Sequence, residues 1–230
     1  MAEDWAGLAE GWRAAGHEVE AVDLWEFQVN GGVSFEEFAS AFNARVRKVG
    51  GEHQLVGYSL GGRLALHAML DDGELWQGAV LVGAHPGLSD EGARIARMGQ
   101  DAEWAAMALT APWEQFVAEW NTQGVLRPQE ELTRWADRSA LEEKRQSVLL
   151  SFMHWSLGKQ ADLRPRLKDL KCPTLWVTGS EDEKFGPLAA EGAGLSPGGA
   201  SCVVEGAGHR VPWEKAEEFG AKVVQFIGDA

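Results

Sequence analysis

The stretch GYSLGG, residues 57–62, stands between a short apolar run and the helix-favouring run RLALHAML at 63–70. The pattern G-x-S-x-G in this setting is typical of a sharp turn between a strand and a helix, which lifts the serine hydroxyl above a sheet. Gly57 and Gly61 are expected to leave room for the turn, and the N-terminus of the helix carries a partial positive charge. We therefore predict that Ser59 is a functional residue and not an ordinary helix N-cap.

Segments that favour strands and helices alternate on both sides of this turn. Apolar runs predict strands at 18–24, 53–59, 78–84, 173–179 and 201–206. Helical spacing of apolar residues, with start and stop signals, predicts helices at 4–15, 34–49, 60–70, 162–169 and 213–227. The helix at 34–49 opens with Ser34 and Glu37, the capping-box pattern. The repeated order of strand, helix and strand predicts an α/β fold with a mostly parallel sheet and right-handed crossovers.

The sequence changes character between residues 86 and 157, where tryptophans are frequent, helical periodicity continues and no convincing strand is found. We interpret 86–157 as a helical cap inserted into a core that is formed by 1–85 and 158–230. Four tryptophans are expected to pack inside this cap: Trp104, Trp113, Trp135 and Trp155.

The composition limits the class of protein. With 230 residues, 45% of them hydrophobic, the chain can bury one sizeable core without disulfides or metals. The net charge of −14 argues against nucleic-acid and anionic-membrane surfaces, because both are bound mainly through clustered Lys and Arg. The two cysteines, Cys172 and Cys202, stand apart and are expected to be reduced structural thiols.

The first residues, MAEDWAGLAEG, lack the basic and apolar regions of a secretory signal. No apolar run approaches the roughly 20 residues that are needed to span a bilayer. We therefore predict a cytoplasmic protein without a membrane partner, of unknown oligomeric state.

A serine hydroxyl needs a base and an orienting carboxylate to react at neutral pH. His209 is the strongest candidate for the base, because the loop GAGH at 206–209 follows the last predicted strand and places the imidazole over the sheet edge. Asp182 in GSEDEKF is the natural candidate for the acid, with Glu181 and Glu183 as solvated alternatives. The order Ser, acid, His along the chain is the one found in α/β-hydrolases.

The other histidines are weaker candidates. His85 directly follows the strand at 78–84, a place that suits substrate contact better than proton transfer. Packed or solvent-facing positions are expected for His17, His53, His67 and His154. No metal site is predicted, because the cysteines and histidines form no cluster with the spacing of metal ligands.

Five stretches together resemble the 2-succinyl-6-hydroxy-2,4-cyclohexadiene-1-carboxylate synthase family of the menaquinone pathway. They are GYSLGGR, HPGLSDEGARIARMGQDAEWA, the AEW at 118–120, GSEDEKF and GAGH, and the similarity covers almost the whole chain. The resemblance implies a capped α/β-hydrolase fold and a lyase reaction. In that reaction the triad removes a proton from an enolpyruvyl-bearing precursor, pyruvate is eliminated and a cyclohexadiene remains. The resemblance implies neither a cofactor nor a metal.

The resemblance also implies substrate-binding positions. Tyr58 beside the serine, Arg97 in ARMGQD and Trp120 in AEW match positions of the family's substrate site. A third family arginine falls near Arg138, and Arg145 is close enough to leave this part of the alignment open.

Arg63 and Leu60 complete the predicted site. Arg63 lies four residues after Ser59 on the same helix face, where its guanidinium can bind a small anionic carboxylate substrate bidentately. The backbone N–H of Leu60 is expected to serve as an oxyanion-hole donor. Taken singly, however, a helical arginine is usually solvated and a tryptophan at helical spacing is usually part of a core.

The start of the sequence departs from the family pattern. Proteins of this fold normally begin with a strand that ends in an HG-type loop, whose backbone N–H contributes to the oxyanion hole, whereas this sequence opens with EDW at 3–5. The absent strand would lie in the sheet between the segments 18–24 and 53–59. We therefore expect an upstream segment of roughly 15 to 20 residues in the working protein.

Two other functions stay open. A serine carboxylesterase or a C–C-bond hydrolase would use Ser59 as a true nucleophile. A binding protein that kept the fold and lost catalysis would account for the absent front strand. The presence of Ser59, Asp182 and His209 together favours an enzyme.

Overall fold

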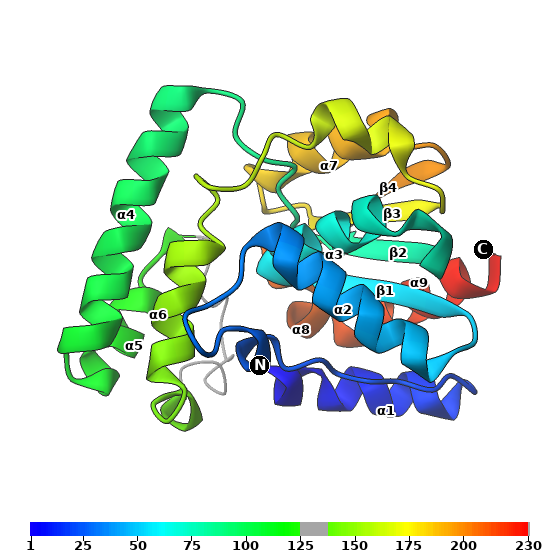
Figure 1. Cartoon of the computed structure of the whole chain (residues 1–230). Helices are drawn as coiled ribbons and strands as arrows, with labels where there is room; N and C mark the ends of the chain where they lie inside the picture. Colours follow the sequence, from blue (N-terminus) through cyan, green and yellow to red (C-terminus); the bar gives the residue numbers. More distant parts are fainter. Residues whose placement is uncertain (125–137, 230) are drawn as a thin grey trace. The chain divides into compact units, whose positions relative to one another are not determined.

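A computed structural model describes residues 1–124 and 138–229 (Figure 1). Contacts within the chain divide it into two compact units. The first, which we call the sheet unit, comprises Met1–Leu24, Phe38–Pro86 and Leu163–Ala230. The second, which we call the helical unit, comprises Trp25–Glu37 and Gly87–Asp162.

Four parallel strands form the sheet in sequence order: β1 His53–Tyr58, β2 Trp76–Val82, β3 Thr174–Gly179 and β4 Gly199–Val204. Val82 at the end of β2 is in register with Tyr58 of β1 and with Val177 of β3. The inner strands β2 and β3 are buried on both faces, which explains their continuous apolar runs. The predicted α/β fold with a parallel sheet is thus confirmed, and the strand bounds differ by no more than two residues, as in 76–82 against 78–84.

The helices of the sheet unit follow the predicted segments with three differences, the first being a helix at 185–195 that was not predicted. They are α1 Ala6–Ala14, α3 Leu60–Asp71, α7 Phe185–Leu195, α8 Val211–Glu214 and α9 Ala216–Asp229, most of α2 Phe35–Val49, and the 3-10 turns η1 Ala2–Trp5, η3 Gly73–Leu75 and η7 Arg164–Asp169. The segment predicted as a helix at 162–169 is 3-10. The helix predicted at 213–227 is interrupted at Lys215, whose φ of −136° and ψ of 54° are not helical and separate α8 from α9.

Two sets of helices cover the two faces of the sheet (Figure 1). Val80 and Val82 of β2 point toward α1 and α9 and share a buried cluster with Trp12. Strand residues of the alternate set point the other way, and the ring of Trp176 would lie only 2.7 Å from a Cβ at Gly192 of α7. Successive side chains of a strand alternate between the two faces of the sheet, so a continuous apolar run places hydrophobic side chains against the helices on both faces.

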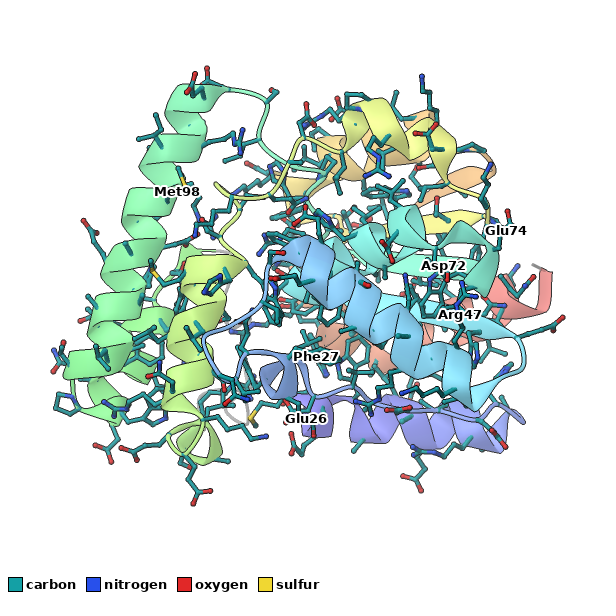
Figure 2. All side chains as sticks on the ribbon, viewed as in Figure 1. Glu26, Phe27, Arg47, Asp72, Glu74 and Met98 are labelled. Atoms are coloured by element: carbon teal, nitrogen blue, oxygen red, sulfur yellow. The ribbon has the colours of Figure 1, made fainter. Side chains whose placement is uncertain are left out.

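Polar contacts fix α2 beside α3 within the sheet unit. The buried amide of Asn43 donates from Nδ2 to the carbonyl of Ala68 at 2.9 Å and to a carboxylate oxygen of Asp71 at 3.0 Å. Arg47 forms an ion pair with Asp72, and Figure 2 shows the two side chains directed at each other. These contacts hold the helix that follows Ser59 against its neighbour.

The prediction of a strand at 18–24 is wrong, because residues 17–23 form neither helix nor strand. The segment has strand-like composition, but a strand also needs a partner for its backbone hydrogen bonds. In the described sheet β1 pairs with β2 alone. Arg13 instead donates to the carbonyl of Val19 at 2.7 Å, and Glu20 forms an ion pair with Arg45.

The helical unit contains α4 Glu91–Thr110, α5 Trp113–Asn121, η6 Ser139–Leu141 and α6 Arg145–His154, with η2 Leu24–Phe27 at its first segment. The side chain of Asp90 caps α4 by accepting from the N–H of Ala93 at 2.7 Å. The predicted capping box is confirmed: Glu37 N–H donates to Ser34 Oγ at 3.1 Å, and Ser34 N–H donates to Glu37 Oε2 at 2.8 Å. In the ranges that the structure describes, no helix combines the length and apolar character needed to cross a bilayer.

Candidate active site

The carboxyl ends of three strands bring together Ser59, Asp182 and His209. Ser59 directly follows β1, Asp182 follows β3 by three residues, and His209 follows β4 by five. In an open parallel sheet these ends meet at one edge, which is where ligands bind in α/β proteins. Residues far apart in the sequence therefore share one site within the sheet unit.

Ser59 occupies a strained backbone conformation. Its φ of 51° and ψ of −110° lie outside the regions that non-glycine residues ordinarily adopt. The chain is fixed there by a hydrogen bond from Ser59 N–H to the carbonyl of Val82 at 2.8 Å. Because α3 begins at the next residue, Leu60, the N–H of Leu60 is one of the first helical donors, which have no acceptor within the helix.

Two glycines make this turn possible, and one of them differs from the prediction. A Cβ at Gly57 would lie 2.7 Å from the carbonyl oxygen of Gly61, and a Cβ at Gly62 would lie 2.8 Å from the Cβ of Ala84. A Cβ at Gly61 would meet nothing within 4 Å. The expectation that Gly61 leaves room for the turn is therefore wrong, because the close approach to the sheet is made by Gly62.

A chain of close polar contacts joins the three side chains. His209 Nδ1 lies 2.6 Å from Asp182 Oδ2, and His209 Nε2 lies 3.4 Å from Ser59 Oγ. Asp182 and His209 are buried, at 7% and 6% exposure. A second oxygen of Asp182 accepts from the N–H of Phe185 at 3.3 Å, which orients the carboxylate.

The structure distinguishes between the three candidate acids of GSEDEKF. Asp182 contacts His209, whereas Glu181 and Glu183 are exposed. The Glu181 backbone N–H donates to the carbonyl of Ala207 at 2.9 Å, and this bond ties the acid-bearing loop to the histidine-bearing loop.

Aromatic rings surround the imidazole of His209. Its centroid lies 4.5 Å from that of Phe185 and 5.3 Å from that of Tyr58. Tyr58 in turn contacts Trp213 edge-on at 4.8 Å. His85, predicted to contact substrate, is buried and contacts the edge of Phe185 at 6.3 Å. The packing restricts the orientations that the histidine ring can adopt.

Sequence reasoning missed two glycines that bound the site. Gly83, directly after β2, has a φ of 53°, and a Cβ there would lie 2.6 Å from Cε1 of His209. A Cβ at Gly179 would lie 2.0 Å from the carbonyl oxygen of Ala207. The signal in the sequence is a glycine at the end of each apolar run, but that pattern does not reveal the distant partner.

Arg63 lies in the first turn of α3, where its N–H donates to the carbonyl of Ser59 at 3.1 Å. Arg63 as a whole is partly exposed. Tyr58 and Leu60 flank Ser59 in the sequence, and Arg63 lies one turn further along α3. The roles of these three residues in the site stay predictions.

Arg97 and Trp120 belong to the helical unit. The Nε of Arg97 donates to both carboxylate oxygens of Asp101 at 2.9 Å each, and Asp101 is only 3% exposed. Trp120 contacts Trp104 at 5.1 Å and Phe152 at 5.0 Å, both edge-on. Both residues have partners inside this unit, and their contact with substrate stays a prediction.

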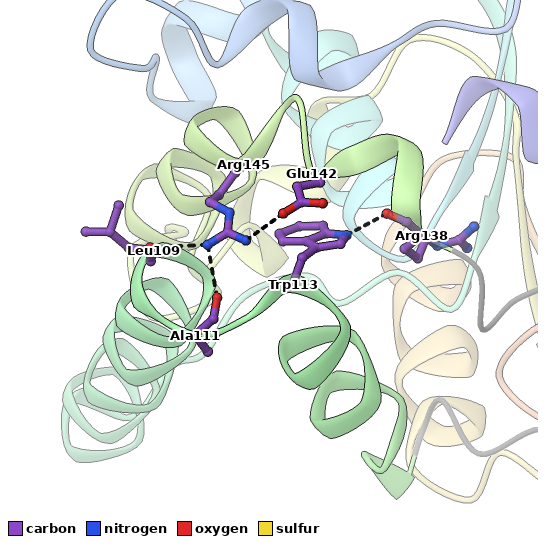
Figure 3. Close-up of polar contacts among 6 residues, drawn as sticks. All are labelled: Leu109, Ala111, Trp113, Arg138, Glu142 and Arg145. Carbon is purple, nitrogen blue, oxygen red and sulfur yellow. Dashed lines mark hydrogen bonds and ion pairs between the residues drawn. The ribbon is translucent and has the colours of Figure 1, made fainter.

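The two alternative arginines of the cap differ in their surroundings (Figure 3). Arg145 donates to the carbonyls of Leu109 at 3.3 Å and Ala111 at 3.0 Å, and its guanidinium lies 5.3 Å from the ring centroid of Trp113. Arg138 offers its backbone carbonyl to Trp113 Nε1 at 2.8 Å, and Figure 3 shows its side chain directed away from that ring. Arg145 thus holds the end of α4.

Trp113 and Trp155 are buried and Trp104 is partly buried, whereas Trp135 lies outside the described residues.

Within residues 1–124 and 138–229, no group of three or more His, Cys, Asp or Glu side chains could hold a metal ion. The site described so far consists of an acid, a base, a hydroxyl and a backbone donor.

Comparisons with known proteins identify the family of this chain. The model of the alpha/beta hydrolase family matches residues 2–222. A 2-succinyl-6-hydroxy-2,4-cyclohexadiene-1-carboxylate synthase from Serratia proteamaculans is 32% identical over 197 residues, which cover 84% of this chain and 75% of that protein. A protein of the same name from Enterobacter sp. is 36% identical over 176 residues, which cover 75% of this chain and 66% of that protein.

A solved structure supports the fold. The structure of MenH from S. aureus superposes with a TM-score of 0.79 at 24% identity and covers 93% of this chain and 79% of that one. The family model and the Serratia relative together decide the assignment. The chain belongs to the alpha/beta hydrolase family and, within it, to the 2-succinyl-6-hydroxy-2,4-cyclohexadiene-1-carboxylate synthases.

Proposed function

We propose that this chain forms 2-succinyl-6-hydroxy-2,4-cyclohexadiene-1-carboxylate by eliminating pyruvate from an enolpyruvyl-bearing cyclohexene carboxylate, a step of menaquinone biosynthesis. The relatives' names give the product, and the elimination of pyruvate is what the resemblance described above implies. The contacts among Asp182, His209 and Ser59 are the observation that carries the proposal, because an elimination that starts with proton removal needs a positioned base. The chain is accordingly an enzyme, a carbon–oxygen lyase on an α/β-hydrolase scaffold.

The proposed mechanism uses the triad as a base. His209 Nε2 accepts the proton of Ser59 Oγ, and Asp182 stabilises the imidazolium through Nδ1–H. The serine oxygen then removes a proton from the ring carbon of the substrate. The electron pair of that C–H bond forms the new double bond, and the C–O bond to the enolpyruvyl group breaks. The leaving enolate takes a proton from His209 at carbon and departs as pyruvate.

The distance of 3.4 Å between Nε2 and Oγ is longer than a strong hydrogen bond. Catalytic hydrogen bonds are often long without substrate and shorten in the complex. The N–H of Leu60 and the N-terminus of α3 stabilise the negative charge that develops on the substrate as the proton leaves.

Binding of the substrate is assigned to the basic and aromatic side chains that were predicted from the sequence. A small anionic substrate with several carboxylates needs local positive charge in a chain whose net charge is −14. Arg63, Arg97 and Arg138 supply it in this proposal, and Tyr58 and Trp120 contact the ring. Arg138 is assigned here because the third family arginine falls near it in the resemblance, while the guanidinium of Arg145 donates to the carbonyls of Leu109 and Ala111.

In this proposal the cap is the stretch 86–157 predicted from the sequence, and most of that stretch belongs to the helical unit. The reaction moves a proton and breaks one C–O bond, so acid–base groups are sufficient for it and no cofactor is assigned. A cytoplasmic location likewise stays a prediction from the sequence.

A serine hydrolase of the same fold is the second candidate. The strained Ser59 turn and the Leu60 N–H are also the parts that acyl transfer requires. In that case Ser59 would attack an ester or ketone carbonyl and form an acyl-enzyme. A binding protein without turnover is the third candidate.

Three measurements together separate the candidates. Pyruvate release from the enolpyruvyl-bearing precursor is measured for the wild type and for Ser59→Ala, with circular dichroism to confirm folding of both. Release that is lost in Ser59→Ala supports the synthase. A burst of nitrophenol from nitrophenyl esters without pyruvate release would favour the hydrolase, and tight binding of a dicarboxylate without turnover would favour the binding protein.

A further inference from the structure

The loop that carries His209 is held by hydrogen bonds on two sides. On the side of the acid loop, Gly206 N–H donates to Ser180 Oγ at 2.9 Å, and the carbonyl of Ala207 accepts from Glu181. On the other side, Gly208 N–H donates to Oε2 of Glu214 at 2.5 Å. Glu214 therefore contacts the residue directly before the proposed base.

Glu214 is placed for this contact by the turn that follows His209. It is the last residue of α8, and its own N–H donates to the carbonyl of Arg210 at 3.0 Å, so its side chain reaches back by one turn. A Cβ at Gly208 would lie 3.3 Å from Oε2, a tight contact from which the Glu214 carboxylate would have to shift by a few tenths of an ångström. The carboxylate, the N–H and the imidazole lie within one short segment.

We propose that Glu214 is a positioning residue, whose carboxylate holds the backbone of Gly208 and thereby sets the distance of His209 from Ser59. The proposal rests on the proposed function, in which His209 is the base. A hydrogen bond to an ionised acceptor is stronger than one to a neutral acceptor. Loss of the charge therefore loosens the loop and misplaces the imidazole, while the triad residues themselves are unchanged.

The ionisation of Glu214 gives the proposal a pH signature. Burial raises the pKa of Glu214 above its ordinary value of 4.5, while the Gly208 N–H and the charges of Arg210 and His209 lower it and that of Glu181 raises it. Because the folded pKa is raised, the folded state favours the protonated form. Between pH 4.5 and the raised pKa, the contribution of Glu214 to the free energy of unfolding falls as the pH rises. Over the same pH range Glu214 ionises, and its hydrogen bond with the Gly208 N–H becomes a charged one. Activity and stability thus change in opposite directions.

The test compares the wild type with Glu214→Gln, which keeps an acceptor oxygen without the charge, and uses Glu217→Gln in the exposed first turn of α9 as the matched control. We expect kcat of Glu214→Gln at neutral pH to fall about tenfold, less than the roughly 100-fold that a 1 Å misplacement costs. The ratio of wild-type to variant kcat should approach one as the pH falls through the pKa of Glu214. Folding stability of the variant should not decrease.

A second measurement on the full chain does not depend on activity. Labelling with carbonyl-¹³C alanine and ¹⁵N glycine selects the amides of Ala–Gly pairs, which in this sequence are Gly7, Gly16, Gly194 and Gly208. The Gly208 amide proton should shift with pH in the wild type, and the step that is due to Glu214 should be missing in Glu214→Gln.

Each outcome is informative. A kcat ratio that is independent of pH, or a variant as active as the wild type, overturns the proposal even if pyruvate release confirms the proposed function. A wild type without pyruvate release overturns the proposed function instead. In that case a Gly208 shift that is the same in both proteins overturns the contact itself, and a shift lost only in Glu214→Gln supports it.

Discussion

The two units of this molecule use their polar and aromatic residues in different ways. In the sheet unit, Ser59, Asp182 and His209 come from the ends of separate strands and contact one another. In the helical unit, Arg97 and Arg145 bind partners on their own or neighbouring helices. The parallel sheet thus brings residues that are distant in the sequence into contact at one edge. The two arginines of the helical unit, in contrast, contact residues of their own or neighbouring helices and so stabilise that unit.

The largest effect is expected from the acid of the sheet unit. Asp182→Asn should lower kcat for pyruvate release about 10³- to 10⁴-fold, because the amide stabilises the wrong tautomer of His209 and not its imidazolium. Glu183→Gln, an exposed neighbour, should leave kcat within about twofold. Steady-state kinetics of both variants test this, and equal effects would remove Asp182 from the site.

A glycine that contacts the base should come next. Gly83→Ala places a Cβ 2.6 Å from Cε1 of His209 at a φ of 53°. We expect kcat to fall by about 10- to 100-fold and the free energy of unfolding to fall by about 1 to 3 kcal/mol. Gly99→Ala in α4, where a Cβ meets nothing within 4 Å, should keep activity and stabilise by up to about 1 kcal/mol. Kinetics and urea unfolding measure both, and unchanged kcat in Gly83→Ala would contradict the described packing.

The pair Arg138 and Arg145 sharpens the comparison within the helical unit. Arg138→Ala should raise KM about tenfold or more with a smaller change in kcat, since it removes the proposed contact with a substrate carboxylate. Arg145→Ala should lower the free energy of unfolding by about 1 to 2 kcal/mol, because it loses two carbonyl acceptors and the Trp113 ring. If instead Arg145→Ala raised KM without a loss of stability, the two roles would be reversed.

The smallest effect is expected at the capping box. Ser34→Ala should lower stability by about 1 kcal/mol and leave kcat unchanged. Hydrogen bonds from Ser34 lower the pKa of Glu37. Above pH 4.5, its ordinary pKa, the Glu37 carboxylate therefore adds to the free energy of unfolding. This contribution is lost as the pH falls through the lowered pKa of the folded state. Thermal unfolding between pH 3 and 7 should show a smaller acid-side loss in Ser34→Ala, and an identical loss in both proteins would exclude this source.

The parts that the sequence predicts well are those decided locally. Apolar runs locate β1 to β4, and the pattern around Ser59 marks the turn because strand, turn and helix are adjacent in the chain. Asp182 and His209 were identified because each follows a strand closely, and strand ends meet at one edge. The fold class and the three residues that contact one another could thus be predicted from short stretches.

The parts that it predicts poorly depend on distant neighbours. The segment 18–24 has the composition of a strand but no partner, so composition alone misleads. Glycine is needed at position 83 because a Cβ there would collide with His209, and at position 62 because a Cβ there would collide with Ala84. The engagement of Arg145 with α4 likewise depends on the packing of helices, which periodicity does not specify.

The most direct test of the account is single-turnover release of pyruvate from the enolpyruvyl-bearing precursor, with enzyme in excess, for the wild type and for Ser59→Ala at equal folded concentration. The wild type should release the pyruvate of all bound substrate, whereas Ser59→Ala should release it at least about 10³-fold more slowly. Equal rates in the two proteins would contradict the central claim that the serine at the end of β1 takes part in removing the proton.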